Sequence, residues 1–124
     1  MGIQDYKELK VWQKSMELVK QIYLLVKLLP KEETYALSDQ MRRAAVSIPS
    51  NIAEGYERQT DKELLHFLSV ARGSCAELET QILIAMDLGY FDKENAEKST
   101  ELCSQVRKML NSFIAIVNKR IKAC

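Results

Sequence analysis

The side chains best suited to catalysis are few in this sequence. Its one histidine is His66, in the run LLHFLS. A lone histidine on a helix is more often a surface or capping residue than a catalytic base. The spacings that mount a serine nucleophile, cradle a phosphate or bind zinc (GxSxG, GxxxxGKS/T, HExxH, paired CxxC) do not occur. Glu54, Glu77 and Glu79 are carboxylates on long helices, where such groups are usually solvated or ion-paired. We therefore predict that the protein is not an enzyme and uses no metal or cofactor.

The cysteines and the apolar runs indicate in which cellular compartment the protein lies, and both favour the cytoplasm. Cys75, Cys103 and Cys124 are odd in number and widely spaced, which suits a reducing environment rather than a disulfide framework. No apolar run approaches the roughly 18 residues of a spanning helix, and the start MGIQDYKELK lacks the apolar core of a signal peptide. We expect a cytoplasmic chain without membrane contact.

A set of polar residues has the spacing of one helix face. Gln40, Ser47, Asn51 and Glu54 are seven, four and three residues apart, so they share one side of a helix that can hydrogen-bond across a bundle, with Ser74 and Glu77 as partners. The whole set is Gln40, Arg43, Ser47, Asn51, Glu54, Ser74 and Glu77. Two interpretations stay open: a structural network that fixes the helix register, or a binding site for a ligand or partner.

The run SIPSNIAEG, residues 47–55, resembles a loop in composition but not in periodicity. Apolar residues recur at steps of three and four on both sides of its proline: Leu37, Met41, Ala44, Ala45, Ile48, Ile52 and Tyr56. Because Pro49 has no N–H for the Ala45 carbonyl, we predict a helix that kinks or loosens there and ends after Gly55.

The composition of the chain and its helix-breaking residues predict the helices that position these groups. Its 124 residues are 47% hydrophobic and 28% charged, with only two prolines and four glycines, which favours a single all-helical domain over residues 1–124. Pro30, a capping box beginning at Thr60, a stop at Gly89 and a cap at Asp92 mark the boundaries. They predict helices over 5–29, 34–57, 60–88 and 92–122. Short connections make this an up-down-up-down antiparallel four-helix bundle.

The first and last helices each carry two apolar stripes. In the first helix we predict that one stripe faces the bundle: Leu9, Trp12, Met16, Val19, Tyr23 and Val26. The other follows the same spacing, interrupted by Ser15: Val11, Leu18, Ile22, Leu25 and Leu29. The last helix repeats the feature, and a bundle helix normally needs only one stripe of about 100°. A homo-oligomer that covers the extra surface is the favoured interpretation; a twisted bundle that buries wide faces unaided is the alternative.

The formal net charge is +1, so no overall field attracts nucleic acid. In the predicted topology, however, cationic residues collect at one end and acidic residues at the other. The cationic set is Lys7, Lys10, Arg58, Lys62, Lys119, Arg120 and Lys122, and the same end also carries Asp5, Glu8, Glu57, Asp61 and Glu63. The near-neutral total charge also permits a purely structural interpretation of this pattern. This end is a candidate nucleic-acid interface, because backbone binding requires clustered Lys and Arg rather than a base-reading motif.

Four segments carry a family resemblance: YKELKVWQKSMELVKQIY, the break at residues 30–33, LSDQMRRAAVSIPSNIAEGYER and FLSVARGSCAELETQI. In this order they resemble the small four-helix-bundle proteins encoded in intervening sequences of bacterial 23S rRNA genes. The resemblance implies an up-down bundle assembled into a homopentameric ring. It also implies a distant similarity to accessory proteins of diversity-generating retroelements, which bind nucleic acid and a reverse transcriptase.

Two functions follow as hypotheses. The first is a non-enzymatic oligomeric module that binds structured RNA or DNA through its cationic end. The second is a protein-interaction scaffold that docks a protein partner and binds no nucleic acid.

Overall fold

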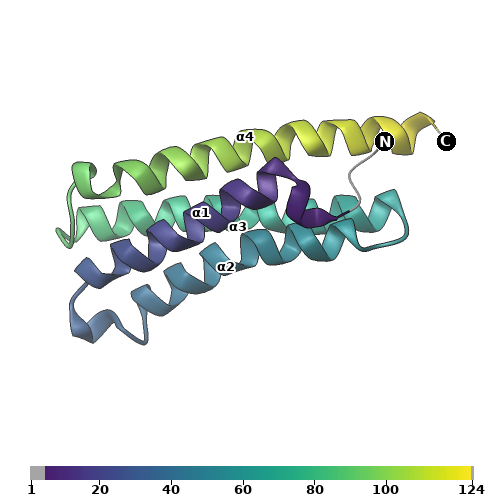
Figure 1. Ribbon diagram of the computed structural model, residues 1–124. Helices are drawn as coiled ribbons and strands as arrows, with labels where there is room; N and C mark the ends of the chain where they lie inside the picture. The colour runs from purple at the N-terminus through teal and green to yellow at the C-terminus, as the bar shows by residue number, and fades with distance from the viewer. Residues whose placement is uncertain (1–4, 124) are drawn as a thin grey trace.

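The protein is a bundle of four long helices (Figure 1), seen in a computed structural model that describes residues 5–123. The helices are α1 (Lys10–Leu25), α2 (Leu37–Tyr56), α3 (Asp61–Asp87) and α4 (Lys93–Ala123). Three short 3-10 turns accompany them, at Tyr6–Glu8, Val26–Leu28 and Lys31–Glu33, and no strand occurs within residues 5–123. The predicted all-helical fold and the four-helix bundle are confirmed.

Consecutive helices run in opposite directions. Arg120 near the end of α4 binds Asp61 at the start of α3, and Arg107, earlier in α4, binds Glu79, later in α3. Around the bundle, α1 packs against α2 and α4, and α3 packs against the same two helices, so α1 and α3 lie diagonally across the core. The start of α1, the α2–α3 turn and the end of α4 therefore share one end of the bundle, where Figure 1 marks both termini.

The first helix begins later than predicted, at Lys10 rather than Asp5. The Asp5 carboxylate accepts a hydrogen bond from the Lys7 N–H at 2.8 Å, which closes a separate turn. Leu9 then adopts an extended conformation (ψ 126°) before α1 starts. A local side-chain cap thus competes with continuation of the helix, as short acidic side chains often do.

The second helix also begins later, at Leu37 rather than Thr34, after the turn at Lys31–Glu33. The Glu33 carboxylate accepts from the Leu37 N–H at 3.3 Å, which satisfies one free donor of the helix start. Its other oxygen accepts the Tyr90 hydroxyl at 2.7 Å, so the α1–α2 and α3–α4 connectors are joined at the far end of the bundle. This hydrogen bond raises the pKa of Tyr90.

Predicted boundary signals are present at the other helix ends. The Thr60 hydroxyl accepts from the Glu63 N–H at 3.2 Å, and the Asp92 carboxylate accepts from the Asn95 N–H at 2.9 Å. Gly89 has a φ of +78°, the left-handed conformation that stops a helix at low steric cost. No helix within residues 5–123 has the length and apolarity to cross a membrane.

The core corrects the predicted orientation of α1. The stripe assigned to the bundle is only partly covered, with Met16 39% and Tyr23 44% exposed. The other stripe forms the core side, and Ser15 is buried with it; its apolar members are Val11, Leu18, Ile22, Leu25 and Leu29. Ser15 fits there because its hydroxyl donates to the Trp12 carbonyl at 2.7 Å. Both stripes have the helical period, so spacing alone does not identify the inner one.

Candidate functional site

The segment Ser47–Gly55 of α2 contacts α3 on one side and α1 on the other. On the α3 side, the hydroxyls of Ser47 and buried Ser74 are 2.8 Å apart. The Asn51 amide donates to the Ser47 carbonyl at 2.8 Å and to the Ser47 hydroxyl at 2.9 Å. These three residues form one hydrogen-bonded cluster across the α2–α3 contact.

Gly55 makes this contact close. A Cβ at Gly55 would lie 2.8 Å from the Phe67 Cβ and 3.2 Å from a Leu64 methyl carbon. The helices therefore approach at a distance that only glycine permits at this position. Gly73 on α3 differs, because a Cβ there would meet nothing within 4 Å.

The rest of the predicted polar strip does not bridge helices. Arg43 pairs with Asp39 at 3.2 Å, and Glu54 pairs with Arg58 at 2.6 Å, each close along the chain. The prediction that Glu77 reaches α2 is wrong: Glu77 is exposed and accepts from Gln81 of its own helix at 3.3 Å. Gln40 is exposed as well. The cross-helix network is thus limited to the serine and asparagine cluster.

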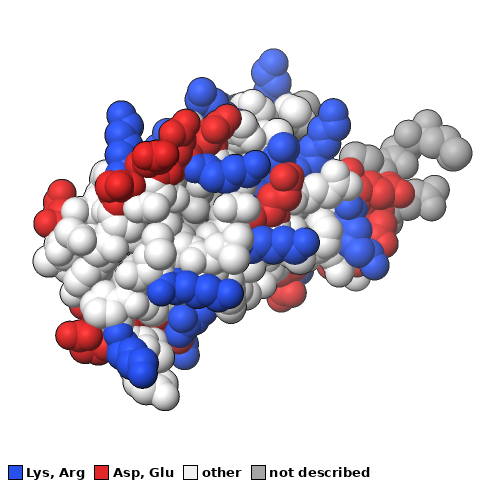
Figure 2. Space-filling model, turned by 60° about the vertical axis from the view of Figure 1, so that its left-hand side comes forward, with Lys and Arg blue, Asp and Glu red and all other residues white. Residues whose placement is uncertain are grey.

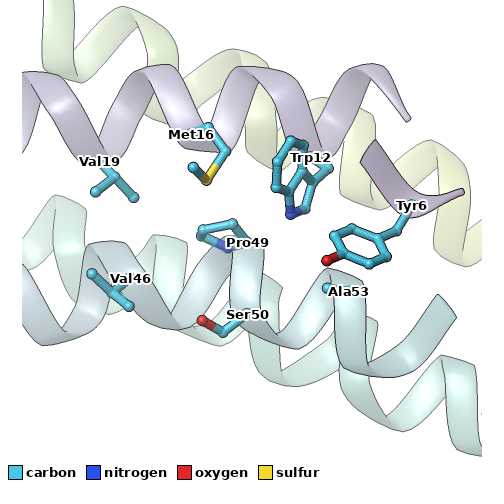
Figure 3. A pocket seen from close by; sticks show the side chains of 8 residues that line it. All are labelled: Tyr6, Trp12, Met16, Val19, Val46, Pro49, Ser50 and Ala53. Atoms are coloured by element: carbon cyan, nitrogen blue, oxygen red, sulfur yellow. The ribbon is translucent and has the colours of Figure 1, made fainter. Parts of the chain in front are cut away.

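On its other side, α2 borders a groove against α1, which the spacing of residues does not predict (Figure 3). The groove encloses about 330 Å³ and is lined by Tyr6, Trp12, Met16, Val19, Val46, Pro49, Ser50 and Ala53. The Pro49 ring points from α2 toward Met16 and Trp12 of α1, and α2 continues as one α-helix through the proline. The prediction of one helix that carries Pro49 and extends past Gly55 is therefore confirmed.

The groove is suited to apolar contact rather than to acid–base chemistry. Tyr6 is the one ionisable residue among its eight lining residues. The Tyr6 and Trp12 rings meet edge to face with centroids 5.5 Å apart, a favourable arrangement that fixes the groove wall. A signal for this surface was present in the sequence, since Trp, Met and Tyr on the outer stripe are residue types common at interfaces.

At the cationic end, the structure brings together the elements that carry the predicted residues, but it pairs three of the seven with carboxylates. Arg120 binds Asp61 through two contacts of 3.0 and 3.2 Å, which raises the pKa of Arg120. Arg58 binds Glu54, and the Lys7 ammonium lies 3.6 Å from the Asp5 carboxylate. The remaining four are exposed and form no ion pair with the described part of the chain: Lys10, Lys62, Lys119 and Lys122.

The groups considered for catalysis remain apart. His66 is exposed, and its ring meets the Phe67 ring edge-on at 5.2 Å. Cys75 and Cys103 are buried, with the Cys103 thiol donating to the Cys75 carbonyl at 3.5 Å. Hydrogen bonding with Cys75 and burial raise the pKa of Cys103, which keeps it a thiol. Within residues 5–123, no three His, Cys, Asp or Glu side chains are placed to bind a metal ion. Cys124 lies outside the described residues.

Comparison with known proteins places this arrangement in a family context. Residues 7–112 match the family model of the 23S rRNA-intervening sequence protein. The structure is similar to a crystal structure from Bacteroides thetaiotaomicron, described as a protein of unknown function from the S23 ribosomal protein family. The TM-score is 0.77 at 28% identity, over 84% of this chain and 97% of the other. No curated protein matches the sequence.

Proposed function

The chain belongs to the 23S rRNA-intervening sequence protein family, and from this premise we propose that it is a non-enzymatic, homo-oligomeric module of the cytoplasm that binds structured RNA or DNA. The contact surface in this proposal is the cationic end of the bundle. Its contact residues are the exposed lysines rather than the arginines, because Arg58 and Arg120 already bind carboxylates.

One observation carries the proposal. Lys62 at the start of α3 and Lys119 and Lys122 at the end of α4 are exposed, lie at the same end of the bundle, and form no ion pair with the described residues. Unpaired ammonium groups on a surface can replace the counterions around phosphates, and releasing those counterions drives association. Binding of this kind reads the backbone and its shape rather than base sequence.

Assembly supports the proposal because one subunit offers few cations. Exposed apolar side chains occur on all four helices. Figure 2 shows a broad surface of uncharged residues, with individual Lys and Arg side chains lying across it. Burial of this surface between copies with parallel axes would place several cationic ends on one side of the assembly. Weak contacts from linked sites then add into useful affinity. We propose a homopentamer, which is the assembly that the family resemblance implies.

The test is fluorescence anisotropy of a labelled rRNA stem-loop and a DNA duplex at about 50 and 200 mM salt. The variant Lys119→Ser/Lys122→Ser should weaken binding and reduce the slope of log K against log salt by roughly two if both lysines contact phosphate. Arg120 is left intact because its removal would also break the contact with Asp61. The matched control, Lys31→Ser/Lys98→Ser, removes the same charge at the opposite end and should bind like the parent chain.

A second candidate function is a protein-interaction scaffold without nucleic-acid binding. The α1–α2 groove favours it, since an aromatic-lined apolar groove suits a hydrophobic side chain of a protein partner. Flat anisotropy curves for the parent chain at both salt concentrations would reject the nucleic-acid proposal and leave the scaffold. Salt-dependent micromolar binding that the control retains and the Lys119/Lys122 variant loses would support the first function.

A further inference from the structure

Two exposed surfaces combine apolar side chains with unpaired charges of opposite sign. The α1 surface is formed by Val19, Lys20, Tyr23, Leu24 and Lys27. The α3–α4 surface is formed by Leu83, Met86, Lys93, Glu97, Thr100 and Glu101. We propose that the α1 surface of one copy docks on the α3–α4 surface of a second copy. This rests on the homo-oligomeric part of the proposed function and specifies its interface.

The α1 surface is apolar with a purely positive border. Leu24 is 55% exposed and Tyr23 is 44% exposed. Lys20 and Lys27 are seven residues apart, so they lie on one side of α1, and neither forms an ion pair within the described residues. No acidic residue lines this surface. A partner that covers Leu24 must therefore face two ammonium groups that this subunit leaves unneutralised.

The α3–α4 surface is a hollow of about 340 Å³ with mainly acidic charge. Leu83 lies in it and is 58% exposed. Glu97 and Glu101 are one helical turn apart on α4 and form no ion pair in the part of the chain that the structure describes. Lys93 is the one cation among the lining residues. The hollow can accept an apolar side chain such as Leu24, with both carboxylates left to meet lysines.

The charges favour unlike surfaces over like surfaces. Pairing of two α1 surfaces would place Lys20 and Lys27 of both copies at one interface with no carboxylate to compensate them. Pairing of two α3–α4 surfaces would bring together two copies of Glu97 and Glu101. Like charges placed together at an interface disfavour it, whereas the heterologous pair supplies carboxylates to the lysines. The occupant is therefore a second copy that presents its other surface.

The position of the two surfaces along the bundle agrees with this assembly. Both lie toward the end that carries the connectors, where Tyr90 binds Glu33, because they occupy the second half of α1, the end of α3 and the start of α4. Copies placed side by side with parallel axes bring them to the same level. In Figure 2, acidic and basic side chains lie beside one another along the upper margin, and basic side chains cross the pale surface below them. Since the two surfaces consist of different residues, one subunit can engage a neighbour through each of them, and repetition closes a ring or extends a filament.

The test is charge reversal, followed by molar mass from analytical ultracentrifugation at about 50 mM salt. Lys20→Glu/Lys27→Glu and Glu97→Lys/Glu101→Lys should each weaken self-association at least tenfold. Each variant alone presents like charges across the interface. In an equimolar mixture the two variants should associate with each other, because a contact between unlike variants regains opposite charges. A closed ring with an odd number of subunits would keep one like-charged contact, so the mixture should regain only part of the mass of the parent assembly. The fourfold variant should associate like the parent chain.

Controls separate this interface from folding and from the proposed function. Lys62→Glu/Lys119→Glu, at the opposite end, should keep the mass of the parent chain, and circular dichroism should show that all variants remain helical. An oligomeric parent whose mass neither reversal changes, or a fourfold variant that does not regain the mass of the parent chain, would overturn this interface while the oligomeric module stands. A monomeric parent at 100 µM would overturn both the interface and the assembly, whereas anisotropy at the cationic end would report on nucleic-acid binding independently.

Discussion

The two sides of α2 differ in how closely they meet a neighbouring helix. Toward α3, Gly55 leaves no room for a Cβ, and Ser47 and Ser74 share a hydrogen bond of 2.8 Å. Toward α1, Val46 is 40% exposed, and a groove of about 330 Å³ remains between the helices. One run of nine residues, 47–55, serves both sides.

This difference separates residues that hold the bundle from residues available to a partner. The α2–α3 contact uses small side chains and satisfied hydrogen bonds, so nearly any enlargement or deletion there should affect stability. The α1–α2 groove is bordered by Met16 and Trp12, side chains that pack against whatever partner is offered. Mutations on the two sides should therefore change the free energy of unfolding by different amounts, and the change at Pro49 should have the opposite sign.

The largest effect is expected at the closest contact. Gly55→Ala should lower the free energy of unfolding by about 2 kcal/mol, because the new methyl group overlaps Phe67 and the helices must separate. Urea unfolding followed by circular dichroism measures the change. The control is Gly73→Ala, which meets no atom within 4 Å and should stabilise the protein by roughly 0.5–1 kcal/mol through helix propensity. Equal effects at the two glycines would contradict the close α2–α3 contact.

Pro49→Ala should act in the opposite direction. Proline inside a helix costs about 3 kcal/mol through its missing N–H and its clash with the preceding turn. Burial of the proline ring against Met16 and Trp12 offsets about 1.5–2 kcal/mol of this cost. We expect a net stabilisation of about 1 kcal/mol in the same unfolding experiment. A clear destabilisation would show that the groove side of α2 is packed as tightly as the α3 side.

The hydrogen bond across the α2–α3 contact should have an intermediate effect. Ser74→Ala should destabilise the protein by about 1 kcal/mol, because the Ser47 hydroxyl loses its partner on α3 while Asn51 still binds it. A double-mutant cycle with Ser47→Ala measures the coupling, which should be about 0.5–1 kcal/mol. A coupling of zero would place the energy of this contact in packing alone.

The smallest effect is expected in the open groove. Val46→Ala should change the free energy of unfolding by less than about 0.5 kcal/mol, because a side chain already 40% exposed loses little buried area and alanine is the better helix former. A loss above 1 kcal/mol would mean that Val46 is covered by another copy or by α1. Repeating the measurement across protein concentrations would separate these two causes.

Local signals in the sequence were sufficient for much of the fold. Thr60, Gly89 and Asp92 act through contacts within a few residues, so their capping roles were predictable. The starts of α1 and α2 lie later than predicted, because Asp5 closes a separate turn before α1 and the carboxylate of Glu33 caps α2 at Leu37. For the candidate site, elements carrying the predicted cations do meet at one end, but the pairing of Arg120 with Asp61 joins residues 59 positions apart.

The sequence by itself determined that the chain forms four helices, where α3 and α4 begin, and which two stripes of α1 are apolar, since these depend on periodicity and on contacts between near neighbours. Only the tertiary structure decided which stripe of α1 lies inside, that Glu77 stays on its own helix, and that Pro49 borders a groove. The physical reason is rotation about the helix axis. A turn of each helix in the bundle leaves its periodicity unchanged, and only the fit of facing side chains, such as Gly55 against Phe67, fixes that angle.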